Sequence, residues 1–128
     1  NAVQTQSTET VNYETVPTAV FSHPPIGAAG WTEEEARDRD TSVVATKSFT
    51  PYSSTVKGLP DETFIKVVYT GSEKRLAGLH VLGPDAPELI QGFALAIRCG
   101  ATQEDLKGFP GIHPTVAEEI FSTKPDAG

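Results

Sequence analysis

Cysteine is almost absent from this sequence of 128 residues, because Cys99 is the only one. A single thiol excludes an intrachain disulfide framework and a zinc site built from several cysteines. A lone thiol in an acidic chain is typical of proteins that work in a reducing compartment. We therefore expect a cytoplasmic location.

Positively charged residues are also few, with 10 lysines and arginines against 17 aspartates and glutamates and a net charge of −7. A nucleic-acid partner or an anionic membrane would require a basic face. The chain also lacks any apolar run near the ~18 residues that a membrane span needs. We expect neither nucleic acid nor membrane among its partners.

The length of 128 residues fits one domain, because two halves would each be too short for a good core. Residues 1–14 are polar and begin with Asn rather than Met. They lack the charged-then-apolar order of a signal peptide. We interpret 1–14 as a flexible tail or an artificial remnant, and 15–128 as the domain.

Apolar and β-branched runs predict strands at 15–22, 43–49, 63–70 and 75–82. The short connection between the last two strands predicts an antiparallel hairpin. Gly27 and Gly30 are expected to bracket a turn, and 50–61 to form a loop. Capping signals at Thr32, Asp85, Thr102 and Thr115 predict helices at 33–39, 86–99, 103–108 and 116–122. This order predicts an α+β fold, an antiparallel β-sheet with helices packed on it.

The helix predicted at 86–99 is apolar on more than one side, because Leu95 and Ala96 lie opposite the main stripe. Gly92 in its middle costs ~1 kcal/mol against alanine, which indicates close packing there. One interpretation is that the second side faces another chain. The other is a central helix in which Gly92 is merely tolerated, and the pattern alone favours neither.

The sequence contains no GxGxxG, GxxxxGK[ST], CxxC or GxSxG motif, so no nucleotide, dithiol or serine-hydrolase signature is present. Catalysis would have to use the three histidines and the carboxylates. His80 alternates with apolar residues and is interpreted as a hydrogen-bonded strand residue, and His23 as part of a turn. A metal site joining His23 and His113 to Glu118 or Glu119 has no support from their spacing.

His113 and the residues after it form the most informative segment, His113-Pro114-Thr115-Val116-Ala117-Glu118-Glu119. Pro114 keeps His113 out of the helical conformation, so the imidazole projects just before a helix. Glu118 can complete a capping box with Thr115, which is a purely structural role. It can also reach back to His113 and fix its tautomer, as a general acid–base histidine requires. The spacing alone favours the cap.

Four ordered stretches resemble the C-terminal dimerisation domain of the glutathione reductase family of pyridine nucleotide-disulfide oxidoreductases. The stretches are VPTAVFSHPPIG from Val16, SFTP from Ser48, QGFALAI from Gln91 with the following Gly100-Ala101-Thr102, and IHPT from Ile112 with Glu118-Glu119. The resemblance covers about residues 16–121. It implies the dimerisation-domain fold and a homodimeric oxidoreductase that serves cell redox homeostasis.

The resemblance also implies roles for individual residues. His113 would be the acid–base that one subunit supplies to the cysteine pair of the other, with Glu118 as its orienting partner. His113 and Pro114 would contact the flavin, and Tyr52 and Glu119 the disulfide substrate. Family members carry a Met-Tyr pair where this chain has Tyr52-Ser53, so the substrate stays open, as does the choice between NADH and NADPH.

The family's FAD, NAD(P) and Cys-x4-Cys segments precede this domain and are not in this sequence. The resemblance therefore implies an isolated domain that by itself binds no FAD and reduces no disulfide, although the parent enzyme uses FAD and NAD(P)H. Two alternatives stay open. One is a free-standing dimerisation or interaction module without redox activity, and the other is a small metal- or ligand-binding protein.

Overall fold

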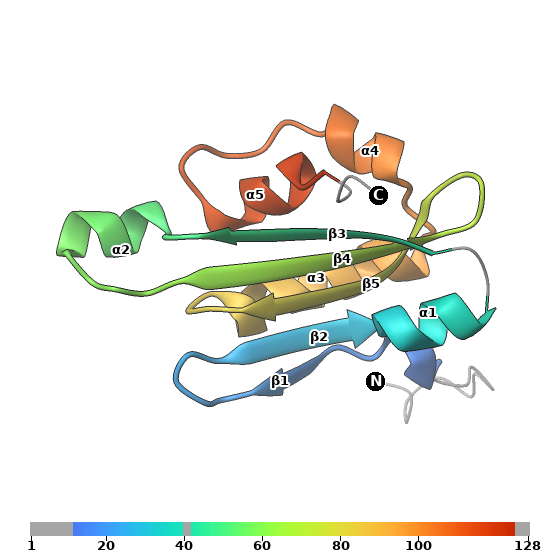
Figure 1. The fold of residues 1–128 in the computed structure, drawn as a ribbon, viewed down its shortest axis with the longest axis horizontal. Helices are drawn as coiled ribbons and strands as arrows, with labels where there is room; N and C mark the ends of the chain where they lie inside the picture. Colours follow the sequence, from blue (N-terminus) through green and yellow to red (C-terminus); the bar gives the residue numbers. More distant parts are fainter. Residues whose placement is uncertain (1–11, 40–41, 125–128) are drawn as a thin grey trace, which may run out of the picture.

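The computed structural model describes residues 12–39 and 42–124, which fold as a sheet with helices packed on it (Figure 1). Its strands are β1 (Thr18–Val20), β2 (Ile26–Gly30), β3 (Ser42–Phe49), β4 (Thr63–Thr70) and β5 (Arg75–Leu82). They lie in the order β1-β2-β5-β4-β3, and every neighbouring pair is antiparallel. The predicted α+β class is confirmed.

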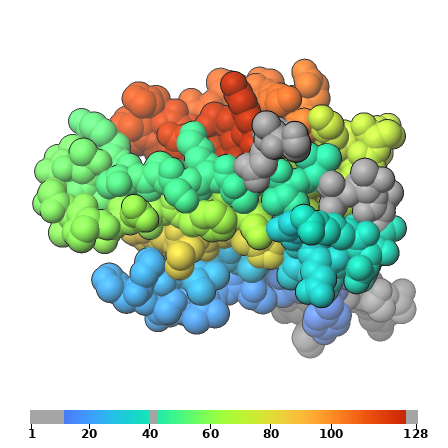
Figure 2. Space-filling view, viewed as in Figure 1, coloured from blue at the N-terminus to red at the C-terminus, as the bar shows by residue number. Residues whose placement is uncertain are grey.

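The helices of the described residues are η1 (Tyr13–Thr15, a 3-10 helix), α1 (Glu33–Arg39), α2 (Tyr52–Lys57), α3 (Ala86–Arg98), α4 (Gln103–Gly108) and α5 (Val116–Ser122). Helix α3 packs across β2 and β5, and α1 contacts β3 and β4. Figure 1 shows α2 beyond the end of β3 and α5 near that strand. Figure 2 shows α4 and α5 along one rim of the molecule, and β1 and β2 along the opposite rim.

The core lies between the sheet and α3. Ile65 and Val67 on β4, Leu79 on β5 and Ile90 on α3 are all buried in one apolar cluster. Tyr69 belongs to the same cluster, and burial raises the pKa of its hydroxyl to about 12. Burial of these side chains supplies the main free energy that holds α3 on the sheet. None of the helices in the described parts of the chain is long and apolar enough to cross a membrane.

Local signals predicted several elements correctly. The hairpin strands occupy 63–70 and 75–82, as expected. Capping boxes begin α4 at Thr102 and α5 at Thr115, where the third helical residue bonds back to the cap. Thr32 and Glu35 make the same reciprocal hydrogen bonds at the start of α1. These motifs are predictable because their partners lie only three residues apart.

The turn expected between Gly27 and Gly30 is wrong, because Ile26–Gly30 is strand β2. A Cβ on Gly27 would lie 2.6 Å from the carbonyl oxygen of Ala86 at the start of α3. The glycine therefore lets the helix approach the strand closely. Close approach of another backbone is a reason for glycine in a strand that is separate from turn formation. The strand predicted at 15–22 is shorter than expected and includes only Thr18–Val20.

The loop expected over 50–61 contains helix α2, so this expectation is also wrong. The backbone N–H groups of Ser54 and Thr55 bond to the carbonyl of Pro51, and the helix ends at Gly58 with φ 66°. Ser54 is buried and its hydroxyl donates to Asp61 at 3.0 Å. Short, serine-rich helices of this kind have little intrinsic propensity, and such tertiary contacts stabilise them.

Asp85 was expected to cap α3 but makes no side-chain cap hydrogen bond. Its backbone has φ −96° and ψ 4°, which differs from the extended conformation typical of an N-cap residue. Residues 1–11 of the predicted tail lie outside the described residues. Tyr13–Thr15 forms η1, which lies against α3 and β2.

Candidate functional site

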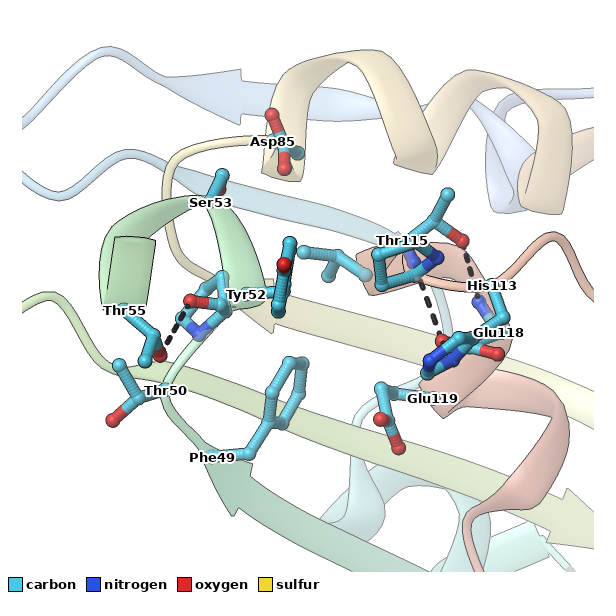
Figure 3. Close-up of a pocket in the computed structure, with 13 residues that line it drawn as sticks. Phe49, Thr50, Tyr52, Ser53, Thr55, Asp85, His113, Thr115, Glu118 and Glu119 are labelled. Carbon is cyan, nitrogen blue, oxygen red and sulfur yellow. Dashed lines mark hydrogen bonds and ion pairs between the residues drawn. The ribbon is translucent and has the colours of Figure 1, made fainter. Parts of the chain in front are cut away.

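A cavity of about 460 Å³ lies between the β3–α2 connection and the segment that leads into α5 (Figure 3). One wall comes from Phe49 to Tyr52 with Ser53 and Thr55, and the other from His113 to Val116 with Glu118 and Glu119. Asp85 completes the lining. Two of the sequence stretches singled out above, although distant in the chain, therefore face one cavity.

His113 and Glu118 are in direct contact. The distance between His113 Nδ1 and Glu118 Oε1 is 2.8 Å, and the same oxygen accepts the backbone N–H of Thr115 at 3.2 Å. The backbone N–H of Glu118 donates to Thr115 Oγ1 at 3.3 Å. The capping role and the histidine contact, which the spacing presented as alternatives, are therefore present together.

The imidazole of His113 is held at one nitrogen and open at the other. Its side chain is 83% exposed, whereas that of Glu118 is 22% exposed. Nε2 has no hydrogen-bond partner among the described residues. A ring fixed through Nδ1 with a free Nε2 can accept or donate a proton at a group that enters the cavity.

Tyr52 and Glu119, the residues expected at the substrate, both line the cavity. Tyr52 is 63% exposed on α2. Glu119 forms an ion pair with Lys47 of β3, and Ser122 Oγ lies 3.2 Å from Glu119 Oε2. Phe49 and Asp85 in the lining, and Lys47 beside Glu119, were not predicted from the sequence. The SFTP stretch beside Tyr52 could have indicated Phe49, but no local signal indicated the other two.

The remaining histidines lie outside the cavity lining. His80 Nε2 is 3.1 Å from the carbonyl oxygen of Trp31, which fits the expected hydrogen-bonded strand residue. Within the described ranges 12–39 and 42–124, no three His, Cys, Asp or Glu side chains are grouped to hold a metal ion. The grouping of His23 and His113 with a glutamate, which their spacing did not support, is not formed among these residues.

The residues present do not fit a complete flavin site. The sequence has no glycine-rich dinucleotide loop, and no strand-to-helix turn of that type precedes a described helix. Among the described residues, the exposed His113-Pro114 segment lies at the cavity.

A second surface, largely apolar, lies where α3, α4 and α5 meet. A groove of about 490 Å³ there is lined by Leu89, Phe93, Phe109 and Phe121 among others. Gly92 opens onto it, and a Cβ on Gly92 would have no neighbour within 4 Å. Leu95 on α3 is 62% exposed. The close packing expected at Gly92 is therefore not supplied by the described residues of this chain.

Comparisons with known proteins agree with the arrangement of these motifs. Residues 16–123 match the family described as pyridine nucleotide-disulphide oxidoreductase, dimerisation domain. The chain is 43% identical over 114 residues to the chloroplastic/mitochondrial glutathione reductase of Pisum sativum. It is 40% identical over 113 residues to the glutathione reductase of Burkholderia cepacia.

These matches cover 88% of this chain but only 21% of the pea protein and 25% of the bacterial one. The chain thus spans about a fifth to a quarter of the length of these relatives. The resemblance expected from the motifs over residues 16–121 is confirmed by the family match over 16–123. The chain belongs to the dimerisation-domain family of the pyridine nucleotide-disulphide oxidoreductases, in its glutathione-reductase-like form.

Proposed function

We propose that this chain is the dimerisation domain of a longer, homodimeric flavoprotein that reduces a glutathione-type disulfide. In this proposal His113 is the acid–base that acts on the dithiol site of the partner subunit, and Glu118 orients it. The observation that carries the proposal is the 2.8 Å contact between His113 Nδ1 and Glu118 Oε1, in a histidine that lines the cavity and is 83% exposed. We also propose that the whole protein is cytoplasmic.

Disulfide reduction needs a proton donor for the departing sulfur, and a histidine suits this role. A thiolate attacks one sulfur of the substrate, the substrate S–S bond breaks, and a mixed disulfide forms. The departing sulfur carries the negative charge, and a proton from His113 Nε2 converts it to a thiol. Glu118 stabilises the imidazolium before transfer and holds the ring so that Nε2 faces the reacting sulfurs.

The attacking thiols would come from a partner subunit. Cys99 is the only cysteine of this chain, and it lies at the end of α3 rather than in the cavity lining. His113 is highly exposed, so a second chain can approach it. Electrons would come from NAD(P)H through FAD held by other segments of the protein, with the His113-Pro114 turn at most lying against the flavin.

The surface around α3 supports self-association. The groove beside Gly92 and the exposed Leu95 are apolar, and burial of such surface against a second copy is favourable. Light scattering of the purified chain should give a mass near twice 13.6 kDa. Leu95→Glu should shift it toward the monomer, whereas Val56→Glu, an exposed site on α2, should not. A strict monomer at millimolar concentration contradicts this interface.

The test of the catalytic proposal uses the full-length protein that contains this chain. His113→Ala should slow disulfide reduction by about 100-fold or more, within the range of a lost acid–base group. Reduction of the flavin by NAD(P)H should stay normal, because the histidine acts after that step. Stopped-flow absorbance separates the two half-reactions. Near-normal turnover of glutathione disulfide by the variant would contradict the role of His113.

A free-standing interaction module without redox activity is the second candidate, favoured by the same apolar groove and by the absence of a second thiol. The natural sequence that precedes Val16 distinguishes the two candidates. FAD- and NAD(P)-binding segments there support the reductase, and a natural protein without them supports the module.

A further inference from the structure

Lys47 on β3 forms an ion pair with Glu119 but does not itself line the cavity. Its ammonium pairs with Glu119 Oε2 and donates to Ser122 Oγ at 3.1 Å. Both charged side chains are partly buried, with 33% of Lys47 and 28% of Glu119 exposed. Glu119 Oε1 has no hydrogen-bond partner within the described part of the chain. Figure 3 shows Glu119 projecting from α5 beside the cavity.

The lining of the cavity is acidic. It includes Asp85, Glu118 and Glu119 but no lysine or arginine. Carboxylates attract a positively charged group of a ligand unless a cation of the protein already neutralises them. Glu118 is already shared between His113 and the cap of α5, so Asp85 and Glu119 are the carboxylates left to meet such a group.

We propose that Lys47 is a positioning residue that sets the charge preference of the cavity through Glu119. Its ammonium occupies the place of a substrate ammonium at Oε2 and orients the carboxylate. With Lys47 present, the preference of the site for cationic over neutral disulfides is therefore weaker than the three carboxylates alone would give. This inference rests on the proposed function, since it concerns the substrate of the same cavity.

Two disulfides of matched shape test the inference in the full-length protein. Cystamine carries two ammonium groups, and bis(2-hydroxyethyl) disulfide carries hydroxyls in their place. The kcat/KM for cystamine divided by that for the neutral disulfide should rise about three- to fivefold in Lys47→Ala, the scale of a surface ion pair. The change should appear in KM for cystamine rather than in kcat for cystamine.

Three further variants separate charge from packing. Lys47→Gln removes the charge but keeps most of the side-chain volume, and it should raise the ratio as Lys47→Ala does. A loss of stability in the alanine variant therefore cannot hide the effect. Lys47→Arg keeps the charge and should restore the wild-type ratio. Lys57→Ala removes an exposed lysine at the end of α2 that has no ion pair among the described residues, and it should leave the ratio unchanged.

The outcomes distinguish this inference from the proposed function. A wild-type protein that reduces neither glutathione disulfide nor the neutral disulfide contradicts the proposed function, and this inference with it. A wild-type protein that reduces both, with the same ratio in Lys47→Ala and Lys47→Gln as in the wild type, overturns only the role of Lys47.

Discussion

Helices α4 and α5 begin with the same capping motif, yet only the motif of α5 contacts a histidine. At α4, Asp105 Oδ2 accepts the backbone N–H of Thr102 at 2.8 Å and the hydroxyl of Thr102 at 2.7 Å. At α5, Glu118 Oε1 accepts the backbone N–H of Thr115 at 3.2 Å and lies 2.8 Å from His113 Nδ1. The carboxylate of Asp105 thus bonds only to the cap residue Thr102 among the described residues, whereas that of Glu118 bonds to both the cap residue Thr115 and His113.

The residue two positions before each cap accounts for the difference, because it is His113 at α5 and Gly100 at α4. The threonine hydroxyls differ as well. In α5 the hydroxyl of Thr115 donates to the carbonyl oxygen of Ile112 at 2.7 Å, whereas in α4 the hydroxyl of Thr102 donates to the carboxylate. A carboxylate oxygen can accept more than one hydrogen bond, so Glu118 Oε1 has capacity left for the imidazole. The comparison shows that a cap and a site residue are compatible roles for one side chain.

The largest contrast between the two caps is expected in activity. Glu118→Ala in the full-length protein should slow disulfide reduction, by less than the ~100-fold expected for His113→Ala, because the histidine remains but loses its orienting partner. Asp105→Ala, the matched change at α4, should leave turnover near the wild-type rate. Steady-state assays with glutathione disulfide measure both. Equal losses in the two variants would show that the effect comes from helix capping alone.

A smaller contrast separates charge from capping at α5. Glu118→Gln retains an oxygen that can complete the capping box but cannot stabilise an imidazolium. Glu118→Gln should reduce turnover and keep the free energy of unfolding close to that of the wild type. Glu118→Ala should lower the free energy of unfolding by ~1 kcal/mol. Urea denaturation and turnover of the same samples give both values. Full activity in Glu118→Gln would mean that Glu118 is only a cap.

The smallest effect concerns acid stability. Hydrogen bonds from the hydroxyl and the backbone of Thr102 hold the pKa of Asp105 below its ordinary value of 3.8. The backbone and hydroxyl of Thr32 likewise hold the pKa of Glu35 below 4.5. Carboxylates with a lowered pKa contribute stability above their ordinary pKa and lose it as the pH falls through the folded-state value. Acid therefore weakens these caps.

Denaturant unfolding at a series of acidic pH values measures this loss. The free energy of unfolding should fall as the pH drops below the ordinary values of 3.8 and 4.5. Asp105→Asn should make the fall shallower, because a neutral amide has no proton to gain. An identical slope in the variant would show that the Asp105 cap contributes nothing to acid sensitivity.

Much of the fold was predictable because its signals are local. The caps at Thr102 and Thr115 join residues three apart, and the hairpin of β4 and β5 closes over a four-residue connection. The prediction failed where a residue is required by a contact with a segment that is distant in the sequence. Gly27 was interpreted as a turn residue, but the carbonyl of Ala86 leaves no room for a Cβ there.

The candidate site likewise combines features that neighbouring residues predict with contacts between residues that are distant in the sequence. By itself, the sequence determined that His113 projects before a capped helix and that Glu118 lies within reach of its imidazole, because Pro114 and the capping box restrict only neighbouring residues. Only the tertiary structure decided that the β3–α2 segment faces this helix, and that Lys47 reaches Glu119. Those contacts join residues distant in the chain, and they form only because burial of the apolar core fixes the sheet and the helices against one another.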